Sequence, residues 1–86
     1  MNEKELYSTL GFVKISKYRI ETLKTIGNSY KMPSEIARET GFKTSQISSA
    51  LHDLKSKNLV VCLNEEVKKG RLYKCSESGL EILECL

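Results

Sequence analysis

The side chains best suited to chemistry lie between residues 43 and 57, in the stretch K-T-S-Q-I-S-S-A-L-H-D-L-K-S-K. Hydroxyl, amide, imidazole and ammonium groups predominate there, and Asp53 supplies its one carboxylate. Such groups form hydrogen bonds and carry positive charge, which suits contacts with phosphates and with the polar edges of planar rings. The candidate binding residues are Lys43, Thr44, Ser45, Gln46, Ser48, Ser49, His52 and Lys55.

A second set of candidates is the basic cluster of Lys68, Lys69 and Arg71 around Gly70. It lies between the branched run at 59–63 and the run L-Y-K-C at 72–75, a pattern that predicts a β-hairpin with the cluster at its tip. Charges at such a tip could simply keep it soluble, or they could contact phosphates. Arg71 is the stronger candidate for a narrow groove, because a guanidinium is less strongly hydrated than an ammonium.

Catalysis and metal binding are disfavoured by what the sequence lacks. His52 is the one histidine, so it has no second imidazole at helical spacing, and no nucleophile–base constellation or phosphate-cradling glycine loop is present. The cysteines, Cys62, Cys75 and Cys85, are widely spaced and form no C-x-x-C pair. We therefore predict no enzyme activity, no cofactor and no metal, with cysteines that act as small apolar residues in a reducing compartment.

Two helices separated by a tight turn must position the first set. Pro33 suits the first position of a helix whose apolar face is Ile36 and Ala37, and Gly41 suits the left-handed residue that ends it. Thr44 or Ser45 is then expected to cap a second helix. Helix, short turn with glycine, and helix are typical of a helix-turn-helix.

The second helix, expected from Thr44 to Lys57, has a clear inner face. Ile47, Leu51 and Leu54 follow one another at i, i+4 and i+7, and Asn58 offers a left-handed stop. With that stripe facing inward, the opposite side presents short polar groups almost free of carboxylates, namely Ser45, Ser49, His52 and Ser56. A plain solvated face is the alternative, although such faces usually carry long charged side chains.

Three further helices are expected. Leu6, Leu10 and Val13 predict a short amphipathic helix over residues 1–13, interrupted near Gly11. Ser16 should cap a firmer helix that ends at Gly27 and Asn28. Ser76 should cap a last helix with an apolar stripe of Leu80, Leu83 and Leu86.

Length and composition describe one folded domain, 1–86, in a chain of 86 residues with 40% hydrophobic residues, 29% charged residues and a net charge of +3. The balance is mildly basic, so it permits an anionic partner without requiring one. No apolar run is long enough to cross a bilayer and no signal peptide is evident, so we expect a soluble cytoplasmic protein.

Four segments carry a resemblance to a known family: S-K-Y-R-I at 16–20, P-S-E-I-A at 33–37, I-S-S-A-L at 47–51 and C-L-N-E-E-V-K-K-G-R-L-Y at 62–73. Over residues 12–83 the chain resembles the small archaeal winged-helix transcriptional regulators related to the ArsR and MarR groups. Met32 and Asn58 depart from the family, which often has Thr or Ser and Gly there. The expected fold is α+β: a winged helix-turn-helix with a three-helix core, a two-stranded β-hairpin wing and a C-terminal helix.

The resemblance implies sequence-specific binding of double-stranded DNA, with the helix from Thr44 to Lys57 in the major groove and the wing from Lys68 to Arg71 on the backbone or in the minor groove. Gln46 is then the best candidate for a bidentate contact to adenine, while Lys43, Thr44 and Ser45 suit phosphates. A homodimer built from the stripe of Leu80, Leu83 and Leu86, with Leu6 and Leu10, would strengthen binding. Two alternatives stay open: a winged helix that binds a partner protein without DNA, and a regulator switched by an effector.

Overall fold

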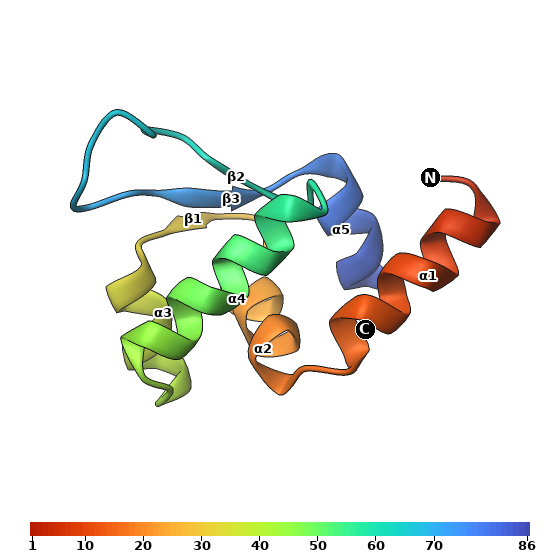
Figure 1. The fold of residues 1–86 in the computed structure, drawn as a ribbon, viewed down its shortest axis with the longest axis horizontal. Helices are drawn as coiled ribbons and strands as arrows, with labels where there is room; N and C mark the ends of the chain where they lie inside the picture. Colours follow the sequence, from red (N-terminus) through yellow and green to blue (C-terminus); the bar gives the residue numbers. More distant parts are fainter.

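The computed structural model describes residues 1–86, which form five helices and three short strands (Figure 1). In chain order they are α1 (Glu3–Lys14), α2 (Lys17–Ile26), β1 (Tyr30–Lys31), α3 (Pro33–Thr40), α4 (Thr44–Ser56), β2 (Val60–Cys62), β3 (Tyr73–Cys75) and α5 (Glu77–Glu84). This order of helices followed by a long β-hairpin is that of a winged helix-turn-helix, as the sequence predicted. No helix combines the length and the apolar character needed to cross a membrane.

Helix boundaries follow the expected caps in part. Ser16 Oγ accepts a hydrogen bond from the backbone N–H of Arg19, and Ser76 Oγ accepts one from Gly79, which confirms both predicted caps. The predicted cap of α4 is wrong, because Thr44 and Ser45 lie inside the helix and Lys43 precedes it. Gln46 Oε1 instead reaches back to accept from the Lys43 N–H at 3.0 Å, so a residue of the first turn satisfies the helix start.

Helix α1 also differs from its prediction. The helix runs without a break from Glu3 to Lys14, so the predicted interruption at Gly11 is wrong. Asn2 Oδ1 accepts from the Glu5 N–H at 2.8 Å, and Val13 is fully buried. A cap and a buried apolar contact together offset the cost of about 1 kcal/mol that an interior glycine brings to a helix.

The sheet has three strands, where a two-stranded hairpin was predicted. Strand β3 lies in the middle and pairs antiparallel with both β2 and β1, in the order β1-β3-β2. Strand β1 contains two residues between α2 and α3, which is too short for any alternation of apolar and polar residues to show in the sequence. It ties the base of the wing to the start of the helix-turn-helix.

The core confirms the inner face expected for α4. Ile47, Leu51 and Leu54 are all buried, in one cluster with residues of α2, α3, the wing strands and α5. At the turn between α3 and α4, Gly41 adopts φ 78°, and Asn58 after α4 adopts φ 58°, both as predicted. The rotation of α4 about its own axis is therefore fixed by burial on one side.

We expect Leu54→Ala to lower the free energy of unfolding by about 2–5 kcal/mol, because it removes a fully buried side chain and leaves a cavity. Urea denaturation followed by circular dichroism measures the change. Leu63→Ala is the matched control, since Leu63 is an exposed leucine and its loss should change stability by about 0.5 kcal/mol or less. Equal losses in the two variants would contradict this description of the core.

Candidate nucleic-acid interface

The outer face of α4 is open to solvent, as the sequence predicted. Helix α4 crosses the front of the molecule in Figure 1. The wing starts near the C-terminal end of α4 and extends above the helix to the upper left. The candidate side chains that are exposed on or beside this helix are Lys43, Thr44, Ser45, Ser48, Ser49, His52 and Lys55. Gln46 is the exception, because it is half-buried.

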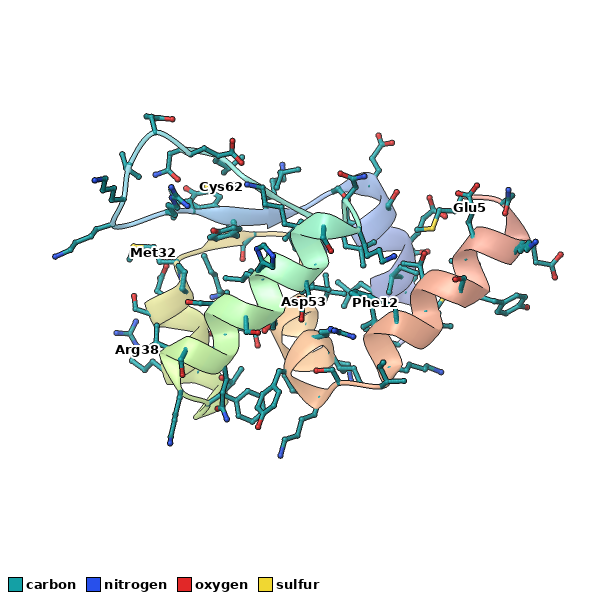
Figure 2. All side chains as sticks on the ribbon, viewed as in Figure 1. Glu5, Phe12, Met32, Arg38, Asp53 and Cys62 are labelled. Carbon is teal, nitrogen blue, oxygen red and sulfur yellow. The ribbon has the colours of Figure 1, made fainter.

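A groove separates the wing from α4 and the start of α3. It encloses about 540 Å³ and brings together most of the two candidate sets, with Thr44, Ser48, His52 and Lys55 from α4 opposite Lys68, Lys69 and Arg71 from the wing. Met32 and Pro33 close it at the start of α3, where Figure 2 shows Met32 beside the wing. No lining residue carries a carboxylate, so the groove presents four cationic side chains without an anion among them.

Three further candidates lie on the other side of α4. Ser45, Gln46 and Ser49 line a smaller hollow of about 260 Å³ together with Ser16 and Tyr18 of the neighbouring α2 region. Lys43 lines neither hollow and stands exposed before α4. The single set expected from the sequence is thus divided by the ridge of α4 into a wing side and an α2 side.

Both ends of the Gln46 amide form a hydrogen bond within the protein. Its Oε1 accepts from Lys43 N–H, and its Nε2 donates to the Tyr18 hydroxyl at 3.0 Å. These bonds join the start of α4 to α2, and the sequence did not suggest Tyr18 as a partner. The amide keeps a second N–H and a second lone pair, and its contact with an adenine edge stays a prediction.

The wing loop is held by side chains that bind its own backbone. Asn64 Oδ1 accepts from Leu72 N–H at 2.8 Å, and Asn64 Nδ2 donates to Gly70 O at 3.1 Å. Arg71 donates from Nε to Val67 O at 2.7 Å and from Nη2 to Glu65 O at 3.2 Å. Arg71 therefore organises the loop while it also lines the groove, and its contact with DNA stays a prediction. Asn64 was not singled out at all.

Lys68 and Lys69 are the wing cations that remain exposed, and neither takes part in a salt bridge. They stand at the tip of a loop whose backbone the Asn64 and Arg71 hydrogen bonds already order. Binding of an anion there would cost less conformational entropy than in a free loop.

Lys55 forms an ion pair with Glu65 and so joins α4 to the wing. The hydrogen bond from Lys55 lowers the pKa of the Glu65 carboxyl below its ordinary value, and the hydrogen bond to Glu65 raises the pKa of Lys55. Both groups are exposed, so the pair contributes little to overall stability and is screened by salt. Its effect is local: it neutralises one carboxylate of the wing.

Arg19 neutralises the other carboxylate close to α4. Its Nη2 lies 3.1 Å from Asp53 Oδ2, its Nη1 donates to Phe12 O at 2.7 Å, and its guanidinium lies 3.9 Å from the centre of the Phe12 ring. Figure 2 shows Phe12 on α1 and Asp53 on α4 on the sides that face each other. One α2 side chain thus ties three helices together and removes the free negative charge of α4.

Side chains capable of redox or metal chemistry are dispersed. The structure contains no group of three or more His, Cys, Asp or Glu residues close enough to hold a metal ion. The three cysteines are free thiols, and burial raises the pKa of the Cys75 thiol to about 11. Cys75 is therefore a protonated core residue at neutral pH.

Comparisons with solved structures identify the fold. The chain superposes on S. aureus MepR in its DNA complex with a TM-score of 0.72 and 16% identity, covering 96% of this chain and 70% of that one. It is also similar to the homodimeric winged helix-turn-helix domain of Mb0332 from Mycobacterium bovis, a possible ArsR-family regulator, with a TM-score of 0.69, 21% identity and coverage of 93% and 72%. A third similar structure is reduced HlyU from Vibrio cholerae, with a TM-score of 0.69, 17% identity and coverage of 100% and 94%.

The class that these similarities establish is the winged helix-turn-helix fold. No protein-family model matches the chain, and no curated protein matches it in sequence.

We expect the Glu65 carboxyl to titrate below its ordinary value of 4.5 in the folded protein, and Lys55→Gln to move the midpoint back toward 4.5. Because the folded-state pKa is the lower one, the ion pair stabilises the protein above pH 4.5, and this contribution is lost as the pH falls through the folded value. NMR titration of the glutamate side-chain carboxyl signals measures both midpoints. An unchanged Glu65 midpoint in Lys55→Gln would contradict the ion pair.

Proposed function

We propose that this protein is a transcriptional regulator that binds double-stranded DNA sequence-specifically, with α4 in the major groove and the wing on the adjacent backbone or minor groove. The observation that carries the proposal is the groove itself. The exposed hydroxyl and imidazole groups of α4 face the wing lysines, and no carboxylate lies among the lining residues. The DNA complex of the structurally similar MepR supports the same partner.

The division of the site by α4 suggests a division of roles. Thr44, Ser48 and His52 lie on the wing side, where their short polar groups suit contacts with base edges in the DNA major groove and with DNA phosphates. Lys68 and Lys69 suit phosphates, with Lys55 behind them. On the α2 side, Ser45 and Ser49 suit the opposite DNA backbone, and Lys43, which precedes α4, also suits a phosphate. Gln46 and Arg71 hold α4 and the wing in place and act through these neighbours.

The main alternative is a winged helix that binds a partner protein through α4 without contacting DNA. A protein-binding helix is expected to present aromatic or large apolar anchors. The exposed face of α4 presents none, since its exposed residues are hydroxyl, imidazole and charged side chains. A binding role without catalysis and a cytoplasmic location follow from the proposal. The finer resemblance to archaeal regulators of the ArsR and MarR groups stays a prediction.

We also propose that the protein binds DNA as a homodimer, since the similar Mb0332 domain is homodimeric. The predicted stripes of Leu80, Leu83 and Leu86 and of Leu6 and Leu10 pack against the protein's own core. The large apolar side chains exposed on α1 and directly after it are Tyr7, at 63%, and Ile15, at 81%.

Gly11 lies between these two side chains, and a Cβ added there would touch nothing within 4 Å. The absence of a side chain at Gly11 leaves room for another backbone to approach α1 closely. This face of α1 is therefore our candidate for the dimer interface.

The proposed function is tested by DNA binding at several salt concentrations. Lys68→Ala/Lys69→Ala should weaken binding to every duplex and reduce the slope of log K against log salt by about 0.9 per lost phosphate contact. Lys24→Ala/Lys74→Ala removes the same charge from exposed positions outside the groove and should leave the slope nearly unchanged. Wild-type protein that shows no salt-dependent binding to any duplex would exclude the proposal.

The dimer is tested by sedimentation velocity. Ile15→Lys should convert a dimer into monomers, because it places a charge in the proposed contact while the side chain touches little of its own protomer. Val61→Lys makes the same change at another exposed apolar position and should leave the dimer intact. A dimer that persists in Ile15→Lys would place the interface elsewhere.

A further inference from the structure

The outer face of the three-stranded sheet carries an apolar patch with a lysine at its centre. Tyr30 of β1 and Val61 of β2 both pair with Lys74 of β3, so these three side chains form one row across the sheet. Leu63 continues the patch beyond β2, where its N–H donates to Leu72 O at 2.8 Å. Tyr30, Val61 and Leu63 are 59%, 43% and 52% exposed.

This patch points away from the proposed DNA groove. Successive side chains of a strand alternate between its two faces. Val60 and Cys75, next to Val61 and Lys74, are buried in the core, and Tyr73 lines the groove beside α4. The outer face is therefore on the opposite side of the sheet, and it can be occupied while the groove holds another partner.

The charge of the patch limits what can bind there. Lys74 is exposed and forms none of the salt bridges in the structure, whereas Lys31 is paired with Glu39 and Lys55 with Glu65. A lone ammonium framed by apolar side chains is complementary to a carboxylate flanked by apolar side chains. A second copy of this chain fits poorly, because a two-fold contact centred on the patch would bring Lys74 against its own counterpart.

The size of the patch limits the partner further. Strands lie about 4.8 Å apart, so the row of three side chains spans about 10 Å, and two residues along β2 add about 7 Å. A patch of about 10 Å by about 7 Å is far smaller than the roughly 800 Å² that each side of a stable protein–protein interface buries. It suits a short segment, such as two turns of an amphipathic helix.

We infer that the outer sheet face binds a short acidic amphipathic segment of a partner protein, whose carboxylate pairs with Lys74 while apolar side chains cover Tyr30, Val61 and Leu63. This inference is independent of the DNA proposal, since it uses the other face of the sheet. It gives the protein two surfaces of opposite preference: a cationic polar groove for a polyanion, and an apolar face with one positive charge for a polypeptide.

The test uses the full chain labelled with ¹⁵N and a helical peptide of about fifteen residues with leucines on one face and a glutamate between them. We expect saturable shifts of the Tyr30, Val61, Leu63 and Lys74 amides. Lys74→Glu should weaken binding about tenfold, and replacing the peptide's glutamate by lysine should reverse the preference of the two proteins. Lys74 is exposed, so the variant should keep the wild-type spectrum elsewhere.

Two outcomes would overturn the inference. One is equal binding of both peptides by wild-type protein and Lys74→Glu. The other is a set of shifts confined to α4 and the wing tip, which would mean that the peptide only follows the charge of Lys68 and Lys69. Lys74→Glu should weaken peptide binding and keep duplex binding, which shows that the peptide result does not depend on the DNA proposal. Lys68→Ala/Lys69→Ala should lose duplex affinity and keep peptide binding, which shows the converse.

Discussion

Burial of Ile47, Leu51 and Leu54 fixes the rotation of α4 about its own axis, and the geometry of the candidate site depends on that constraint. A helix held by one apolar stripe must turn its opposite side outward, so Ser45, Ser49 and His52 face solvent. The wing is positioned by the same core, because Val60 and Cys75 at its base are buried with the α4 stripe. One cluster of buried side chains thus sets both walls of the groove.

Electrostatic pairing then determines the sign of that groove. Asp53 of α4 is paired with Arg19, and Glu65 of the wing is paired with Lys55 of α4. Lys68 and Lys69 have no such partner, on a loop that backbone hydrogen bonds from Asn64 and Arg71 already order. The groove between α4 and the wing is accordingly positive, although the net charge of the whole chain is only +3. An ordered positive concavity suits a polyanion because little entropy is lost when it binds.

The sequence predicted most elements that depend on local patterns, although the cap of α4 and the break at Gly11 were wrong, and it missed contacts between residues distant in the chain. The α4 stripe, the caps at Ser16 and Ser76 and the hairpin all follow from spacing within a few residues. Strand β1 is too short to show a period, and it exists because β3, more than forty residues later, pairs with it. Gln46 donates to Tyr18, which lies 28 residues earlier in the chain, and no local pattern encodes that contact. Arg71 binds carbonyls of its own loop, whose irregular backbone has no periodicity from which the bonds could be predicted.

The proposed function requires one DNA duplex to contact both walls of the groove between α4 and the wing. NMR chemical-shift mapping tests it most directly, with a short DNA duplex titrated into ¹⁵N-labelled protein at low salt and again at higher salt. We predict salt-sensitive shifts of the amides of Thr44, Ser48, His52, Lys68 and Lys69, which line the groove. Shifts that spare these residues and cluster instead on α1, α5 or the outer face of the sheet would contradict the account.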